Sequence, residues 1–140
     1  MEDNDSFYKS LINNLFEGIY FVDRDRRITF WNDSAERISG FSAAKVVGKV
    51  CADNILNHVN EAGVNLCRNG CPLAATIQDG KLRKMEVYLL HADGYRVPVI
   101  VHTSPIYDDQ GKIIGAVESF TDNKELFLTK KKVQSLKKRT

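Results

Sequence analysis

Apolar and polar residues follow two different periods along this chain, and these periods predict its helices and strands. Near the start, apolar residues recur every four positions at Phe7, Leu11 and Leu15, which predicts an amphipathic helix with one apolar stripe. Further on, runs of β-branched and aromatic residues lie between polar turns, which predicts strands. The expected order is a helix within 1–16, strands over 19–22 and 27–31, a helix that ends at Gly40, short helices over 42–47 and 72–78, and strands over 84–91, 95–107 and 112–121.

Short polar residues and glycines mark the ends of these elements. Asn32 or Asp33 is placed to cap the helix that Gly40 ends, because a short polar side chain satisfies free amide groups in the first turn. The Asp93-Gly94 pair predicts a hairpin between the strands that flank it. Two strands, then short helices, then three antiparallel strands predict an α+β fold with one five-stranded antiparallel sheet and short helices on one side.

The composition is that of a soluble globular chain. Its 140 residues are enough for one hydrophobic core, and 43% hydrophobic and 27% charged residues are ordinary values for such a domain. No apolar run approaches the roughly 20 residues of a membrane-spanning helix. The acidic, polar start of the chain is not typical of a signal peptide, so we expect a cytoplasmic location.

The order of these elements and the residues at their joints resemble the PAS domain family of sensory modules, over about residues 10–125. The resemblance is carried by Asp23, Trp31-Asn32, Ala35-Glu36, Gly40-Phe41, Val47-Gly48, His91-Ala92-Asp93-Gly94-Tyr95, Ser104-Pro105-Ile106-Tyr107-Asp108, Gly111, Gly115 and Phe120-Thr121-Asp122. Each piece alone is weak, and their order and spacing give the resemblance its weight. It implies a flanking helix for dimerisation over 1–16, a PAS sensor domain over 17–121 and a C-terminal signalling helix or linker over 122–140.

The resemblance also implies a curved sheet folded over helices, which encloses a pocket for a cofactor or a small ligand. The apolar residues that are candidates to line it are Phe21, Phe30, Tyr88, Leu90, Val99, Val101 and Val117. The alternative is that they simply fill the core, as buried aromatic and aliphatic residues do in any domain. The sequence does not decide which face of each strand points inward.

The three cysteines of the chain form a cluster with one histidine: Cys51, His58, Cys67 and Cys71. Three thiolates and an imidazole are a sound ligand set for zinc, and cysteine-rich sites also hold iron–sulfur clusters. The alternative is that the cysteines are small buried apolar residues and that His58 lies at the surface. A Cys67–Cys71 disulfide in a reducing compartment would act as a redox switch.

Other cofactors known in the family can be tested against the sequence. A covalent flavin site would read Asn-Cys-Arg-Phe-Leu-Gln, and residues 66–71 share only Cys67-Arg68 with it, which argues against flavin. The Cys-x-x-Cys-His motif of attached haem is absent from the sequence. Non-covalent haem would need an axial histidine, for which His58 is the candidate, but a lone histidine is usually structural.

The end of the chain is basic and has a helical pattern. Residues 122–140 carry a net charge of +5, so the rest of the chain carries −3. Apolar or small residues recur there at three- and four-residue spacing: Leu126, Thr129, Val133 and Leu136. We expect a solvated helix that couples to the domain through Asp122 and Glu125, and not a nucleic-acid-binding segment, because no aromatic or helix-turn-helix pattern accompanies the charge.

Taken together, these features predict a sensory module for signal transduction that binds a small ligand or a protein partner. We expect a homodimer through Phe7, Leu11 and Leu15, and a fused output domain after Thr140, first a diguanylate cyclase and next a histidine kinase. No nucleophile–base pair or phosphate loop suggests catalysis by this segment itself. The alternative is a free-standing metal- or redox-responsive regulator that uses Cys51, Cys67 and Cys71.

Overall fold

The computed structural model describes residues 2–50, 56–66, 70–122, 132–134 and 136. Its elements, in chain order, are α1 (Glu2–Asn13), β1 (Gly18–Asp23), β2 (Ile28–Trp31), α2 (Asp33–Ser39), α3 (Ala43–Val46), α4 (Pro72–Asp79), β3 (Arg83–Leu90), β4 (Arg96–Tyr107) and β5 (Ile113–Asp122). The types and the order of the elements expected from the sequence are confirmed.

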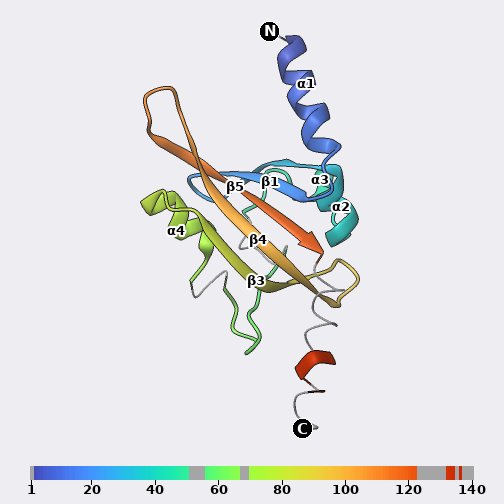
Figure 1. The fold of residues 1–140 in the computed structure, drawn as a ribbon. Helices are drawn as coiled ribbons and strands as arrows, with labels where there is room; N and C mark the ends of the chain where they lie inside the picture. Colours follow the sequence, from blue (N-terminus) through green and yellow to red (C-terminus); the bar gives the residue numbers. More distant parts are fainter. Residues whose placement is uncertain (1, 51–55, 67–69, 123–131, 135, 137–140) are drawn as a thin grey trace.

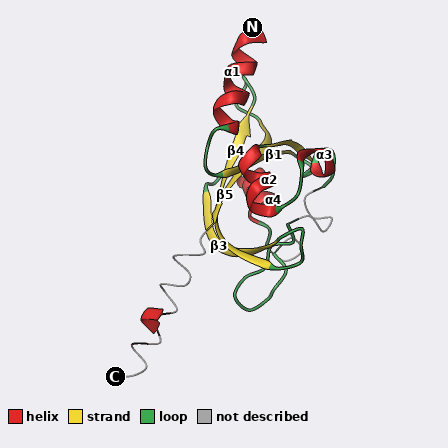
Figure 2. Cartoon of the chain, turned by 90° about the vertical axis from the view of Figure 1, so that its right-hand side faces the viewer, coloured by secondary structure: helices red, strands yellow, loops and turns green. Residues whose placement is uncertain are grey.

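The five strands form one antiparallel sheet in the order β2-β1-β5-β4-β3. The sheet is curved, and α2 and α4 lie on its concave side, whereas α1 projects away from the sheet (Figures 1 and 2). We call the face of the sheet toward α2 and α4 the inner face. The predicted α+β fold with a five-stranded sheet is therefore confirmed.

β5 is the central strand, with β1 and β4 as its neighbours. It approaches β1 very closely at one point: a Cβ atom added at Gly115 would lie 2.0 Å from the carbonyl oxygen of Val22. No side chain fits at that distance, so the register of β1 and β5 requires glycine at this position.

The hydrophobic core lies between the inner face and the helices. Strand residues alternate between the two faces, and the buried ones on the inner face are Tyr20, Val22, Ile28, Trp31, Val87, Leu89, Val97, Val99, Val101, Ala116 and Phe120. The helices add Ala35 and Ile38 from α2, and Leu73 and Ile77 from α4. Each fully buried aliphatic side chain contributes about 2 kcal/mol to folding, so this layer supplies most of the driving force.

Asn32 joins the start of α2 to the N-terminal part of the chain. Its side-chain oxygen accepts hydrogen bonds from the backbone amides of Ile19 (2.9 Å) and Ala35 (2.8 Å). Its side-chain amide donates to the carbonyl oxygens of Ile12 (2.9 Å) and Glu17 (3.0 Å). Of the two candidates for the cap of α2, the structure therefore selects Asn32.

The turn between β3 and β4 closes the concave side against the end of α2. The amide of Ala92 donates to the carbonyl oxygen of Ser39 at 2.9 Å. Gly40 ends α2 with a φ of 78°, and a Cβ atom there would lie 2.5 Å from the ring of His91. Glycine therefore serves both the left-handed conformation and the close contact with the turn.

Both edge strands are hydrogen-bonded to neighbouring segments outside the sheet. On β2, the amide of Ile28 donates to the carbonyl oxygen of Lys49 at 2.8 Å. On β3, Tyr88 and Val59 exchange two backbone hydrogen bonds, of 2.9 and 3.0 Å. Segments between the first and second halves of the sheet thus occupy part of each edge.

The N-terminal helix is shorter than the sequence predicts. α1 ends at Asn13, so Leu15 lies beyond the helix rather than on its last turn. The carbonyl oxygen of Leu15 accepts a hydrogen bond from the hydroxyl of Ser34. In the C-terminal segment, residues 132–134 and 136 are helical, and Glu125, Leu126 and Thr129 lie outside the described residues.

No helix in the described part of the chain is long and apolar enough to cross a membrane.

Candidate ligand site on the inner face of the sheet

One residue from each strand forms a row that crosses the inner face. The register aligns Arg83 of β3 with Thr103 of β4, Thr103 with Glu118 of β5, Glu118 with Tyr20 of β1, and Tyr20 with Trp31 of β2. We call these five residues the transverse row. The rows two positions away on the same face are apolar: Met85, Val101, Phe120 and Gly18 on one side, and Pro105, Ala116, Val22 and Ile28 on the other.

Two neighbouring members of the transverse row, Thr103 and Glu118, are polar, buried and incompletely hydrogen-bonded. Thr103 is 1% exposed and Glu118 is 2% exposed. Neither Oγ1 of Thr103 nor Oε2 of Glu118 has a hydrogen-bond partner among the described residues. A buried polar group without a partner costs about 1–3 kcal/mol of stability, so the position of these two atoms is not explained by folding alone.

Burial also changes the charge of Glu118. Desolvation raises the pKa of its carboxyl group from 4.5 to about 8, because the surrounding core disfavours the ionised form. At neutral pH the side chain is therefore mainly a neutral acid, which carries a hydroxyl donor and a carbonyl acceptor. The site thus offers hydrogen bonds without a net charge.

Aromatic rings lie next to this polar centre. The ring centroids of Tyr20 and Trp31 are 5.2 Å apart, and the ring of Phe120 lies 6.1 Å from Tyr20 and 6.3 Å from Trp31. The indole N–H of Trp31 donates to the carbonyl oxygen of Phe41 at 2.9 Å, which fixes the orientation of that ring. The transverse row therefore combines a polar centre with an aromatic end.

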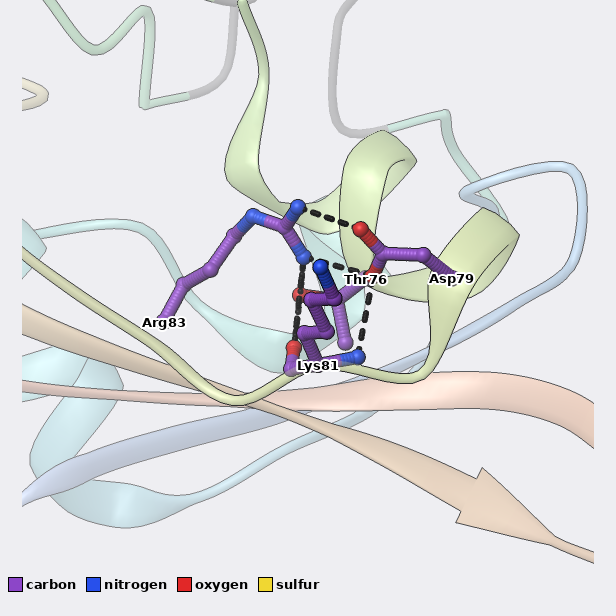
Figure 3. Close-up of polar contacts among 4 residues, drawn as sticks. All are labelled: Thr76, Asp79, Lys81 and Arg83. Atoms are coloured by element: carbon purple, nitrogen blue, oxygen red, sulfur yellow. Dashed lines mark hydrogen bonds and ion pairs between the residues drawn. The ribbon is translucent and has the colours of Figure 1, made fainter.

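At the opposite end, Arg83 ties the row to α4 (Figure 3). Its guanidinium group donates to both carboxylate oxygens of Asp79, at 2.8 and 2.6 Å, and to the hydroxyl of Thr76 at 3.1 Å and the carbonyl oxygen of Lys81 at 3.2 Å. The hydrogen bond from Arg83 holds the pKa of the Asp79 carboxyl below its usual range. The positive charge of Arg83 is thus paired with Asp79 at the junction of α4 and β3.

The structure divides the seven residues predicted to line a pocket. Val99 and Val101 lie on the inner face and are buried. The other five occupy the alternate positions of their strands and belong to the opposite face: Phe21, Phe30, Tyr88, Leu90 and Val117. The rings of Phe21 and Phe30, for example, pair with each other at 5.1 Å on that side.

Thr103, Glu118 and Tyr20 were not among the residues predicted from the sequence for this site. The sequence of β5 does contain a signal for Glu118. At alternate positions it reads Ala116, Glu118 and Phe120, and a carboxylate between two apolar residues on one face of a strand is unusual. The pattern becomes informative only when the buried face is known, and the sequence left that face open.

The structure describes two of the four members of the cysteine–histidine cluster. His58 is only 8% exposed, so the alternative that placed it at the surface is wrong. Burial and, second, the charge of Arg96 lower the pKa of His58 to about 4, and its Nε2 has no partner among the described residues. Cys71 is half-buried at the N-cap of α4, whereas Cys51 and Cys67 lie outside the described residues.

A neutral imidazole with a free Nε2 is suited to bind a metal, so His58 remains a candidate ligand. Within the described residues, however, no group of three or more potential ligands lies close enough together to hold a metal ion. The expected metal site therefore stays a prediction.

The residues predicted for coupling and dimerisation lie at the two ends of the domain. Asp122 is the last residue of β5 and is exposed, and it aligns with Val99 of β4. Phe7 and Leu11 on α1 are 58% and 48% exposed, and Leu15 after it is 48% exposed. Large apolar side chains are thus accessible along α1, as an interaction surface requires.

These observations first define a class: α+β domains with helices packed on one face of a curved five-stranded antiparallel sheet. Residues 17–125 match the sequence pattern of the PAS domain family, and the chain belongs to this family. PAS domains are sensory modules typical of signal transduction, and this segment is accordingly regulatory. Among curated proteins, no sequence is a significant match.

Solved structures agree with this family. A PAS domain from Colwellia psychrerythraea has a TM-score of 0.70 and 21% identity, over 86% of this chain and 97% of that chain. The PAS domain of Bordetella pertussis BvgS has a TM-score of 0.65 and 23% identity, over 99% of both chains. A PAS domain from a two-component sensor histidine kinase has a TM-score of 0.68 and 14% identity, over 86% of this chain and 97% of that chain. At these identities the similarity concerns the fold.

Proposed function

We propose that this chain senses a small ligand on the inner face of its sheet and regulates an output domain fused after Thr140. The observation that supports this proposal is the position of Glu118. The strand that carries this buried, incompletely paired carboxyl group is β5, whose last residue, Asp122, leads into the C-terminal segment. A ligand that engages Glu118 would therefore act on the strand through which the chain leaves the domain.

The central position of β5 in the sheet favours the transmission of a signal from Glu118 to Asp122 along this strand. Because β5 is hydrogen-bonded to β1 and β4 along its length, a ligand contact at Glu118 biases the whole middle of the sheet rather than one side chain. Regulation needs two arrangements of such an element that a ligand stabilises to different extents. A change in the position or twist of β5 at Asp122 is the simplest pair of arrangements.

The proposed dimer forms through α1. This helix projects away from the domain (Figure 1), and its apolar residues Phe7 and Leu11 are exposed in the single chain. A helix of 12 residues that stands apart from its domain is only marginally stable in water. A second copy that packs on the same stripe would bury these side chains and stabilise both helices, and Leu15 just after the helix would join the contact.

For the output domain, a diguanylate cyclase is the first proposal and a histidine kinase the second. The kinase proposal gains support from the similar PAS domain of a two-component sensor histidine kinase. Both outputs place the chain in the cytoplasm, and the basic C-terminal segment then serves as a solvated linker helix rather than a nucleic-acid-binding surface.

The test uses the full-length protein with Asp122→Ala. We expect the output activity to change by about fivefold or more, at the lower end of typical coupling energies, while the fold of the domain is retained. Cyclic di-GMP formation from GTP reports a cyclase, and autophosphorylation by ATP reports a kinase. The matched control is Asp109→Ala, an exposed aspartate in the turn before β5. Equal activity of wild type and Asp122→Ala contradicts the proposal.

A second candidate function is a free-standing metal- or redox-responsive regulator that uses Cys51, Cys67 and Cys71. The buried, unpaired Nε2 of His58 is the observation that favours it, because it would serve as a fourth ligand. Elemental analysis decides between the two functions: one zinc or iron per chain that is lost in His58→Ala supports the regulator.

A further inference from the structure

The end of α1 and the start of α2 cap each other. The side-chain amide of Asn32 donates to the carbonyl oxygen of Ile12 at 2.9 Å. In the opposite direction, the backbone amide of Asp33 donates to Oδ1 of Asn13 at 3.2 Å. Ile12 and Asn13 are the last two residues of α1, and Asp33 is the first of α2. Each helix thus satisfies a backbone group that the other leaves open at its terminus.

Two further side chains of α2 hold the connection from α1 to β1. The hydroxyl of Ser34 donates to the carbonyl oxygen of Leu15 at 2.5 Å. The guanidinium group of Arg37 donates to the carbonyl oxygen of Phe16 at 3.0 Å, and its carbon lies 5.7 Å from the centroid of the Phe16 ring. We call the side chains of Asn32, Ser34 and Arg37 the clamp. A connection with these carbonyl groups engaged is a poor hinge, because a change of its backbone dihedrals breaks hydrogen bonds.

The other end of α2 is bonded to the sheet. The backbone amide of Ala92, in the turn between β3 and β4, donates to the carbonyl oxygen of Ser39 at 2.9 Å. The indole N–H of Trp31, on β2, donates to the carbonyl oxygen of Phe41 at 2.9 Å, just after the helix. The seven residues of α2 span only about 10 Å, so a movement at one of its ends reaches the other.

We propose that the clamp joins α1 and α2 into one rigid unit, which couples the packing of α2 on the sheet to the direction of α1 and to the pairing of α1 with a second copy. A shift of α2 then turns α1, and pairing of α1 restrains α2 in return, because a coupling free energy is reciprocal. The coupling rests on the dimer of the proposed function. It gives this dimer a route of regulation that is separate from β5 and Asp122.

The test follows two NMR signals at the far end of α2 while the chain is diluted: the amide of Ala92 and the indole N–H of Trp31, the single tryptophan. Analytical ultracentrifugation of the same samples gives the fraction of dimer. In wild type, we expect both signals to shift in proportion to that fraction. The clamp lies at the opposite end of α2 from these reporters, so a direct effect of the dimer contact on them is small.

A double variant, Ser34→Ala with Arg37→Ala, opens the clamp and keeps the apolar stripe of α1. Alanine favours the helix, so α2 is retained, which circular dichroism verifies. We expect the dimer to form with a dissociation constant about fivefold higher, since α1 is no longer held in one direction, and the two signals to shift severalfold less. Glu36→Ala, an exposed position of the same helix, is the matched control and behaves like wild type in both measurements.

Two results overturn the coupling. In one, wild type dissociates on dilution and neither signal shifts. In the other, the double variant shows the same shifts as wild type, so the coupling does not pass through the clamp.

The proposed dimer fails separately, if wild type stays monomeric at every concentration. The rigid unit is then judged on ¹⁵N order parameters of residues 14–17. Values near 0.85 in wild type and below about 0.6 in the double variant support it, and equal values in the two proteins overturn it.

Discussion

At the scale of single residues, Asn32 has the largest structural role relative to its size. One buried amide group satisfies backbone groups of α1, of the connection to β1, of β1 itself and of α2. No other short side chain offers two acceptor positions and two donors in this arrangement, and an aspartate would lack the donors. The order of the whole N-terminal third of the domain therefore depends on this side chain.

We predict that Asn32→Ala lowers the free energy of unfolding by about 3 kcal/mol, because it removes a helix cap and leaves buried amide and carbonyl groups unpaired. Urea denaturation followed by circular dichroism measures this loss. The matched control is Asp33→Ala, at the next position and exposed, which we expect to change the free energy by less than about 0.5 kcal/mol. Equal effects of the two variants would contradict the role given to Asn32.

Two buried titratable residues make opposite contributions to the pH dependence of folding. Glu118 has a pKa of about 8 when folded and 4.5 as the reference value, so its contribution to stability decreases as the pH rises through this interval. His58 has a pKa of about 4 when folded and 6.5 as the reference value, so its contribution increases as the pH rises from 4 to 6.5. The two slopes oppose each other below pH 6.5, and only that of Glu118 remains above it.

We therefore predict that the free energy of unfolding falls by about 1 kcal/mol per pH unit between pH 6.5 and 8. Glu118→Gln removes this fall, because the amide does not titrate, whereas the exposed Glu17→Gln keeps it. Urea denaturation at several pH values in this interval gives the slopes. A wild-type slope that matches that of Glu118→Gln would show that the folded carboxyl group is already ionised.

At the scale of elements, the sequence predicted the helices and strands well because their patterns are local. Alternation over 84–91 and the Asp93-Gly94 turn are sufficient to place β3 and the start of β4. α1 was expected to extend to Leu15 and ends at Asn13. What ends it is the set of contacts around Asn32, which connect segments far apart in the sequence and have no local pattern.

The candidate site was harder to predict for the same reason. A residue on a strand faces the core or the solvent according to which neighbours cover the sheet, and this cover comes from α2 and α4. Of the predicted lining residues, Val99 and Val101 lie on the inner face, but Pro98 and Ile100 on the other face are apolar too, so the pattern of β4 does not distinguish its two faces. Glu118 was not predicted as a site residue because a glutamate is ordinarily exposed, and only the register of β4 and β5 places it opposite Thr103.

We predict that Leu11→Glu disrupts the dimer, because it places a charge in the apolar stripe of α1. We expect the dissociation constant of the dimer to rise by about tenfold or more, as measured by analytical ultracentrifugation over a range of concentrations. Ser10→Glu adds the same charge at the neighbouring position of α1 and serves as the control. An unchanged mass distribution in Leu11→Glu means that α1 is not the dimer contact.

At the scale of the whole molecule, the cofactor question reduces to a direct measurement on freshly purified protein. We predict that its absorption spectrum has no visible band of flavin or haem, because residues 66–71 lack the flavin motif and a lone candidate histidine such as His58 is usually structural. Metal analysis of the same sample measures zinc and iron. A haem or flavin band would contradict this prediction, and stoichiometric metal would support the cysteine-based regulator.

The contacts that occupy the sheet edges have a consequence for how the protein assembles. An open edge strand recruits further strands and lets a complex grow without limit, as in fibres. Here Ile28 is bonded to Lys49 on one edge and Tyr88 to Val59 on the other, so neither edge is an open template along its full length. If the dimer proposed above forms through the apolar stripe of α1, it is a helix pair related by a twofold axis, and such a pair is complete with two chains. The covered edges and the proposed helix contact together favour an assembly of fixed size over a growing one.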